Sequence, residues 1–230
     1  MVSSMITETR RIGGNLSLLV SVDEKNRKLK ERISVLSREQ EKMEEILLEN
    51  QRFKKLLDYR NEVPYALIPA RIIGSTPYVW YSSLVIDKGR RQGIADDLAV
   101  IAYQDDKSGV VGRISGAVRD VSKVRLLTDV SSEIAAMVQR TRDHGVVAGS
   151  MKKFLRMKYL SLHADVKEGD VIITSGLGGI FPKGLVIGHV RSVVLRRDAL
   201  YLDVSVEPEI EFAKLEEVLV IKGVKEFSIE

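Results

Sequence analysis

Residues 16–57 read LSLLVSVDEKNRKLKERISVLSREQEKMEEILLENQRFKKLL, and apolar side chains recur in this stretch at alternating spacings of three and four. This spacing averages 3.5 residues, which is the period of a left-handed coiled coil. No glycine or proline interrupts the chain between Asn15 and Leu57. The pattern therefore predicts one continuous helix, roughly 63 Å long at 1.5 Å per residue.

A helix of this kind needs a partner, because most of its stability comes from packing its apolar stripe. No second long amphipathic helix follows in the sequence, so we expect the partner to be a second copy of the chain. Asn26 lies on the stripe, where asparagine fixes register and favours two strands at a cost in stability. We therefore predict a weak dimer; the alternative is one helix lying across the rest of the chain. The predicted dimer seam is Val22, Asn26, Leu29, Ile33, Leu36, Met43 and Leu47.

After Tyr65 the sequence changes to short runs with β-strand character, separated by glycine-rich and aspartate-rich turns. The predicted strands are 66–73, 83–87, 98–102, 109–114, 124–128, 134–139, 145–148, 155–160, 171–174, 185–190, 201–206 and 217–221. Residues 131–140 could equally form one short helix. Strands of this length and spacing favour two small closed barrels, so the fold class is mainly β with a long N-terminal α-helix. Alternation predicts that Leu155, Met157 and Tyr159 point inward.

Composition argues against several kinds of ligand. The net charge is only +4 and forms no basic cluster, so nucleic acid is not an expected partner. The chain has no cysteine, and His144, His163 and His189 lack metal-ligand spacing, so we expect neither a metal site nor a cofactor. The sequence has no run of about 18 apolar residues, so it predicts no membrane-spanning helix.

Two motifs suggest chemistry, and both are better explained by structure. His144, Asp165 and Ser175 follow the chain order of chymotrypsin, but only 31 positions separate the histidine from the serine. Chymotrypsin places these two residues on different barrels, so a protease is a remote alternative and we expect no catalytic residues. The glycine-rich stretch 176–179 lacks phosphate-loop spacing and a following helix, and it predicts a tight loop between strands.

An aromatic cluster is the one candidate for partner binding that the β region offers. Tyr78, Trp80 and Tyr81 lie close together in the sequence. They could belong to the core, or they could form an exposed anchor for a partner or for self-assembly.

Seven stretches carry a resemblance to a known family. They are ENQRFKKLL (49–57), WYSSLVIDKG (80–89), GVVGRI (109–114), LLTD (126–129), RTRDHGVVAG (140–149), ADVKEGDVIITSGLGGIFPKGLVIG (164–188) and LEEVLVI (215–221). Their ordered set resembles the rod shape-determining protein MreC family. Three positions depart from the family pattern: Val130 and Val186 replace a common proline, and Arg142 replaces a common glycine.

The resemblance implies a non-enzymatic scaffold of cell elongation that forms dimers or filaments and binds a penicillin-binding transpeptidase. It also implies the membrane protein MreD and the actin-like MreB as members of the same complex. Family members are anchored by one membrane helix before the coiled coil, on the extracytoplasmic (periplasmic) side of the inner membrane. That helix is expected to be missing from this sequence. A periplasmic adaptor of an exporter is the alternative, although adaptors have a two-armed helical hairpin and this sequence has one arm.

The family fold implies a coiled coil followed by two small barrels, each like half of chymotrypsin. We expect a disordered or cloning-derived start over 1–15 and the coiled-coil helix over 16–60. The two barrels are expected over 66–223 and a tail over 224–230. The boundary between the barrels is expected near residue 123, with the segment 123–185 possibly inserted in the first barrel.

Overall fold

The computed structural model describes residues 2–75, 82–194 and 200–224, with side chains from residue 24 to residue 223 of these ranges. The chain divides into two units. Residues 1–58 form the first, which is helical, and residues 59–230 form the second, which contains all the described strands.

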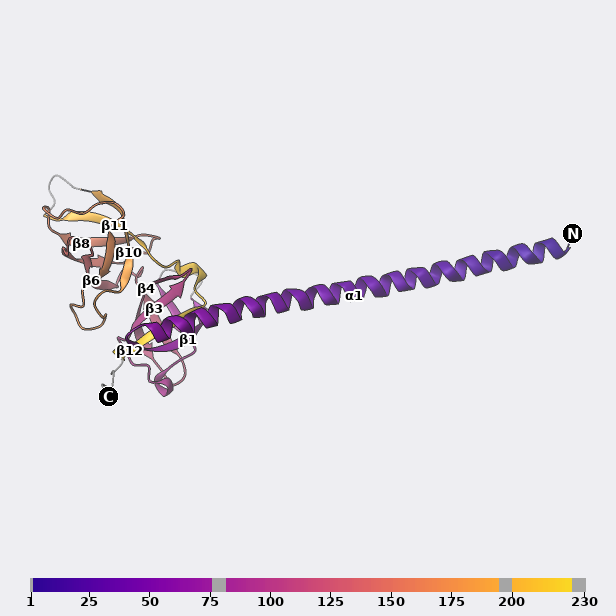
Figure 1. Cartoon of the computed structure of the whole chain (residues 1–230), viewed down its shortest axis with the longest axis horizontal. Helices are drawn as coiled ribbons and strands as arrows, with labels where there is room; N and C mark the ends of the chain where they lie inside the picture. Colours follow the sequence, from indigo (N-terminus) through magenta and orange to yellow (C-terminus); the bar gives the residue numbers. More distant parts are fainter. Residues whose placement is uncertain (1, 76–81, 195–199, 225–230) are drawn as a thin grey trace. The chain divides into compact units, whose positions relative to one another are not determined.

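Helix α1 (Val2–Glu62) has 61 residues and is unbroken in Figure 1. At 1.5 Å per residue it is roughly 92 Å long. Residues 2–15, which we expected to be disordered or cloning-derived, are helical, because Gly13 and Gly14 each weaken a helix by about 1 kcal/mol without ending it. The helix ends before Val63 and Pro64, since proline disfavours helical geometry in the residue before it. No described part of α1 is apolar enough over 18 residues to cross a bilayer.

Twelve strands follow among the described residues, in the places that the sequence pattern predicts, and residues 131–140 contain a strand rather than a short helix. The first barrel contains β1 (Tyr65–Ser75), β2 (Ser83–Ile86), β3 (Ala99–Gln104), β4 (Lys107–Ala117), β5 (Ser122–Leu126) and β12 (Glu217–Val224). It closes in the order β1-β12-β3-β4-β5-β2. The yellow β12 lies beside the purple β1 in Figure 1, and the two strands pair antiparallel.

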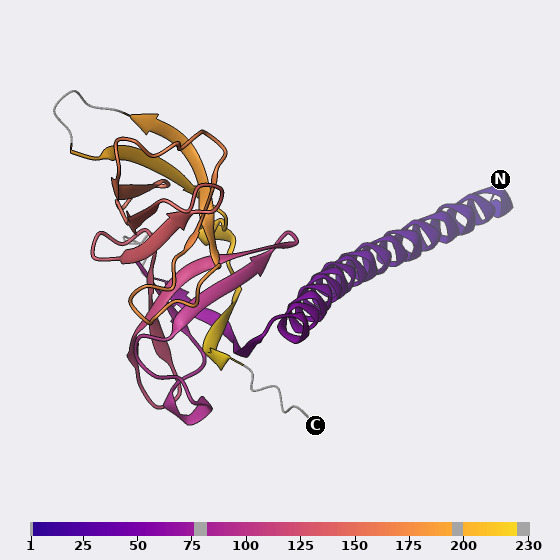
Figure 2. The ribbon, with the colours of Figure 1, turned by 60° about the vertical axis from the view of Figure 1, so that its left-hand side comes forward.

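The second barrel contains β6 (Glu133–Val138), β7 (His144–Ala148), β8 (Leu155–Leu160), β9 (Val171–Thr174), β10 (Val186–Val194) and β11 (Leu202–Pro208). It closes in the order β10-β11-β8-β7-β6-β9. All its strands lie between β5 and β12 in sequence, so the inserted segment extends beyond residue 185 to β11. Figure 2 shows these brown and orange strands as a group apart from the purple and magenta ones.

Each barrel has an apolar core. Ile86, Val100, Ile114, Val124 and Leu219 are fully enclosed in the first barrel, and Leu155, Met157, Ile172, Ile187 and Val204 in the second. At two positions the strands pack so closely that only glycine fits. A Cβ on Gly112 would lie 1.9 Å from the Arg125 carbonyl oxygen, and one on Gly188 would lie 2.0 Å from the Glu207 carbonyl oxygen. Both glycines belong to the stretches that carry the family resemblance.

One inward prediction is wrong. Leu155 and Met157 are buried, but Tyr159 is 55% exposed. The pairing of β8 with β11 skips a residue between Leu160 and Met157, and Tyr159 adopts a left-handed φ of 62°. This bulge turns the tyrosine outward, where it meets Tyr201 edge-to-face at a ring separation of 5.4 Å.

Candidate interaction surfaces

The predicted dimer seam is an exposed apolar stripe on α1. Leu29, Ile33, Leu36, Met43 and Leu47 are each between 55% and 66% exposed, and Asn26 is exposed among them. The side chain of Val22 lies outside the described residues. Large apolar side chains this open to water do not stabilise their own unit by burial. The stripe is therefore available for a second helix.

Apolar side chains are not confined to the seam. Val35, Ile46 and Leu48 are each about half exposed on α1. Met43, Ile46 and Leu47, with Glu39 and Lys42 beside them, line a shallow surface hollow of about 400 Å³. The seam is therefore widest in the second half of the helix, where a partner would bury the most area.

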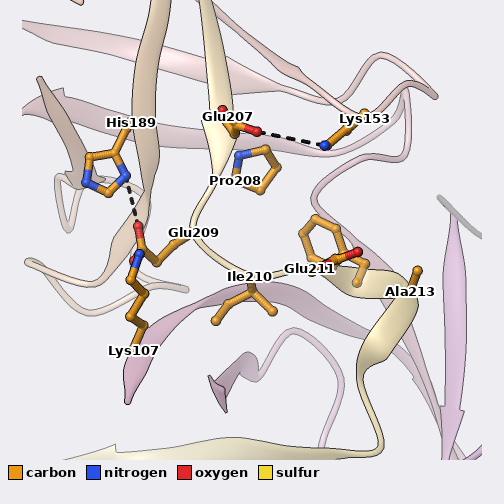
Figure 3. A pocket seen from close by; sticks show the side chains of 10 residues that line it. Lys107, Lys153, His189, Glu207, Pro208, Glu209, Ile210, Glu211 and Ala213 are labelled. Carbon is orange, nitrogen blue, oxygen red and sulfur yellow. Dashed lines mark ion pairs between the residues drawn. The ribbon is translucent and has the colours of Figure 1, made fainter. Parts of the chain in front are cut away.

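The junction of the two barrels forms a second surface, a cavity of about 530 Å³ (Figure 3). Glu209 lines this cavity with a side chain only 8% exposed. One of its carboxylate oxygens forms an ion pair with Lys107 Nζ of the first barrel at 3.1 Å, and the other lies 2.9 Å from His189 Nδ1 of the second. Glu207 pairs with Lys153 at 3.9 Å on the rim. One carboxylate thus contacts a side chain of each barrel.

The backbone at this junction is tied to both barrels. The Glu209 N–H donates to the Ile187 carbonyl at 3.0 Å, and the Glu211 N–H donates to Gln104 Oε1 at 3.1 Å. Ile210, between them, is buried and fills the space above Gly109, where a Cβ would lie 2.7 Å from the isoleucine. The junction is therefore a packed connection. Sequence spacing could not predict this connection. Lys107 and Glu209 are far apart in the sequence, and only the order of the strands in the barrels brings them together.

A third hollow of about 600 Å³ lies between β12 and the glycine-rich loop that joins β9 to β10. Gly176, Gly178 and Gly179 all have left-handed φ values, which agrees with the prediction of a tight loop. Leu177 at the loop's edge is 65% exposed. No phosphate-binding helix follows this loop, because β10 comes next.

The protease-like residues are not assembled into a site. The Asp165 carboxylate accepts a hydrogen bond from Arg140 Nη1 at 2.8 Å, which lowers its pKa. The Ser175 hydroxyl accepts from the Leu177 N–H at 3.2 Å and is buried. Among the described residues, neither group bonds to His144. The chain order of the three residues therefore reflects no catalytic geometry.

Arg140 has a structural explanation instead. It also binds Asp170 through two nitrogen atoms, Nε at 2.9 Å and Nη2 at 2.8 Å. This two-pronged bond lowers the pKa of Asp170 and raises that of the guanidinium. Arg140 thereby connects the turn after β6 to the loop before β9. In the same turn Arg142 has a φ of 67°, a left-handed value that favours glycine.

Two further predictions concern the aromatic cluster and metal binding. Tyr78, Trp80 and Tyr81 lie outside the described residues, so their prediction as partner anchors stays a prediction. No cluster of three or more histidine, aspartate or glutamate side chains with metal-binding geometry occurs among the residues that the structure describes.

Comparison with known proteins agrees with the fold and the motifs. The family model described as the barrel core of the rod shape-determining protein MreC matches residues 72–222. A cell shape-determining protein MreC from Listeria monocytogenes is 31% identical over 203 residues, which cover 86% of this chain and 68% of the relative.

Solved structures agree as well. An MreC structure from Listeria monocytogenes superposes with a TM-score of 0.64 and 30% identity, covering 87% of this chain and 97% of that chain. A second, from a complex between penicillin-binding protein PBP2 and MreC of Helicobacter pylori, has a TM-score of 0.55 and 17% identity. It covers 68% of this chain and 97% of that chain, and it shows a shared fold. The chain belongs to the MreC family of rod shape-determining proteins.

Proposed function

We propose that this chain is a non-enzymatic scaffold of bacterial cell elongation, which pairs through α1 and presents its barrels to cell-wall synthesis enzymes. The observation that carries the proposal is the apolar stripe of α1, exposed at five described seam positions. A long helix with such a stripe is stabilised mainly by a second helix that covers it. Pairing would join two barrel units into one assembly with two docking surfaces.

A penicillin-binding transpeptidase is the proposed partner enzyme. Support comes from the Helicobacter pylori complex, whose MreC shares this fold. The two barrels also suit a docking role, because each has a buried apolar core enclosed by a closed ring of six strands. Contacts with MreD and MreB, and placement outside the inner membrane with a membrane anchor, stay predictions from the family.

Self-assembly into filaments needs a route other than strand pairing. Each described barrel closes on itself and leaves no free edge among its six strands, so exposed strand edges do not supply this route. The stripe of α1 is therefore the proposed self-association surface.

The seam is tested by replacing Ile33 with glutamate and Leu36 with lysine. The double variant should be a monomer in sedimentation at concentrations where the parent chain dimerises, with barrel unfolding unchanged. The matched control replaces Val35 with glutamate and Leu48 with lysine, which lie on the same helix off the seam and are equally open to water. Unaltered sedimentation of the seam variant would refute the proposal.

The partner is tested by a pull-down with periplasmic proteins. Recovery of a penicillin-binding transpeptidase supports the proposal, and recovery of an outer-membrane channel instead would favour the exporter adaptor. Labelling of Ser175 by a fluorophosphonate would favour a protease, and a Ser175→Ala variant is the control for that reaction.

A further inference from the structure

β12 extends beyond its pairing with one of its two neighbours. On one side it pairs with β1 from Glu217 to Val224, with one bulge. On the other side it pairs with β3 only at Leu219 and Val220. The barrel therefore has no edge strand, but residues 221–224 of β12 keep one side on which no described strand pairs with them.

The third hollow, of about 600 Å³, lies at this part of β12. One wall consists of residues 221–223, the other is the glycine-rich loop over 175–183, and Leu98, the residue before β3, also lines it. A Cβ built on Gly223 or on Gly179 would meet nothing within 4 Å, so the space beside the backbone is open on both walls. Glycine in a strand often marks a place where another backbone approaches closely. The hollow therefore has room for an extended chain beside β12.

The loop wall is held in place by its own hydrogen bonds. Thr174 Oγ1 donates to the Pro182 carbonyl at 2.5 Å, and the Leu177 N–H donates to Ser175 Oγ at 3.2 Å. Phe181 anchors the loop with its buried side chain, whereas Leu177 is 65% exposed. A wall that is already ordered loses little conformational entropy when a ligand binds. The exposed leucine can therefore serve as an apolar contact at low cost.

Two lysines give the hollow a positive charge. Lys222 belongs to the first barrel and Lys183 to the second, and both are exposed. The described residues that line the hollow include no aspartate or glutamate. Neither lysine forms an ion pair with another described residue. An acidic ligand would therefore gain two favourable contacts without breaking an existing pair.

We infer that this hollow binds an extended, acidic segment of another protein, which pairs with the open side of β12. Main-chain hydrogen bonds to residues 221–224 would supply affinity whatever the sequence of the segment. Side chains would supply selectivity, with an apolar one against Leu177 and acidic ones beside Lys183 and Lys222. The inference rests on the proposed docking role of the barrels and deepens it, because it names the place and the chemistry of one contact.

The probe is a fluorescein-labelled peptide that alternates leucine and glutamate, and fluorescence anisotropy follows its binding. We expect saturable binding to the parent chain, and binding on the order of tenfold weaker to the double variant Lys183→Glu and Lys222→Glu. The matched control replaces Lys123 and Lys152 with glutamate, since these lysines are also exposed, one on each barrel, and do not line the hollow. No saturable binding to the parent chain up to about 1 mM peptide would overturn the inference. Equal weakening by the two double variants would overturn it as well.

Backbone methylation tests the pairing with β12. The same peptide methylated on every backbone nitrogen cannot donate hydrogen bonds to a strand, so it should lose binding although its side chains are unchanged. Equal binding of the methylated and unmethylated peptides would overturn the inference, because the contact would then not depend on strand pairing.

Sedimentation and the pull-down separate this inference from the proposed function. If the parent chain dimerises and recovers a transpeptidase but does not bind the peptide, the inference fails and the proposed function stands. If the chain binds the peptide but neither dimerises nor recovers the enzyme, the proposed function fails and the binding site stands. Weaker dimerisation of the Lys183→Glu and Lys222→Glu variant would show that a second copy of the chain occupies the hollow, and it would overturn the inference.

Discussion

Gly112→Ala tests whether the close approach of β4 and β5 sets the stability of the first barrel. The new methyl carbon would lie 1.9 Å from the Arg125 carbonyl oxygen, and real contacts of this kind do not fall below 3.0 Å. The strands must therefore separate by about 1.1 Å. A backbone hydrogen bond stretched from about 2.9 Å by that amount is broken. The overpacking and the loss of two backbone hydrogen bonds should together lower the free energy of unfolding by about 3–5 kcal/mol.

Gly116→Ala is a control within the same strand, because nothing lies within 4 Å of the position its Cβ would take. Urea denaturation followed by fluorescence should show a midpoint about 1–2 M lower for Gly112→Ala, given a slope of about 2–3 kcal/mol per M. The control should stay close to the parent. If the two variants unfold within about 1 kcal/mol of each other, the close approach does not govern stability.

Three further substitutions probe the second barrel and the junction. Arg140→Gln should destabilise the chain more at neutral pH than at pH 3. Bonding to the arginine lowers the pKa of Asp170, so this stabilisation is fully present above the carboxyl's unfolded pKa and is lost as pH falls through the lowered folded pKa. Urea titrations at both pH values check this, and equal losses would contradict it. Glu209→Gln should loosen the contact with His189, costing about 1–3 kcal/mol and raising amide hydrogen exchange at the junction; unchanged exchange would argue against the link. Leu155→Ala, which empties a fully enclosed position, should cost about 2–5 kcal/mol in thermal unfolding, and a smaller loss would mean that the barrel collapses around the space.

Local patterns were sufficient to predict the elements. Period 3.5 predicts α1 and period 2 predicts strands, because both patterns depend on neighbouring residues that must face the same side. Glycine, aspartate and proline mark the turns for equally local reasons, as at Asp105 and Asp106, which adopt left-handed φ values between β3 and β4. The seam residues follow from the same periodicity.

Those local patterns could not predict which strands, distant in sequence, pair with each other. The bulge that turns Tyr159 outward depends on its register with β11, some 45 residues away in sequence. Glu209 meets Lys107 and His189 because the chain leaves the second barrel there and returns to the first. Sequence spacing carries no information on which distant strands lie side by side.

The amino-acid sequence alone determined the long helix, the number and places of the strands and the family to which the chain belongs. Only the tertiary structure decided how the strands close into barrels, that β12 completes the first barrel after the second is finished, and which charged groups meet between them. The physical reason is that periodicity records which side of an element is buried, whereas closure and junction contacts depend on hydrogen bonds between strands far apart in the chain.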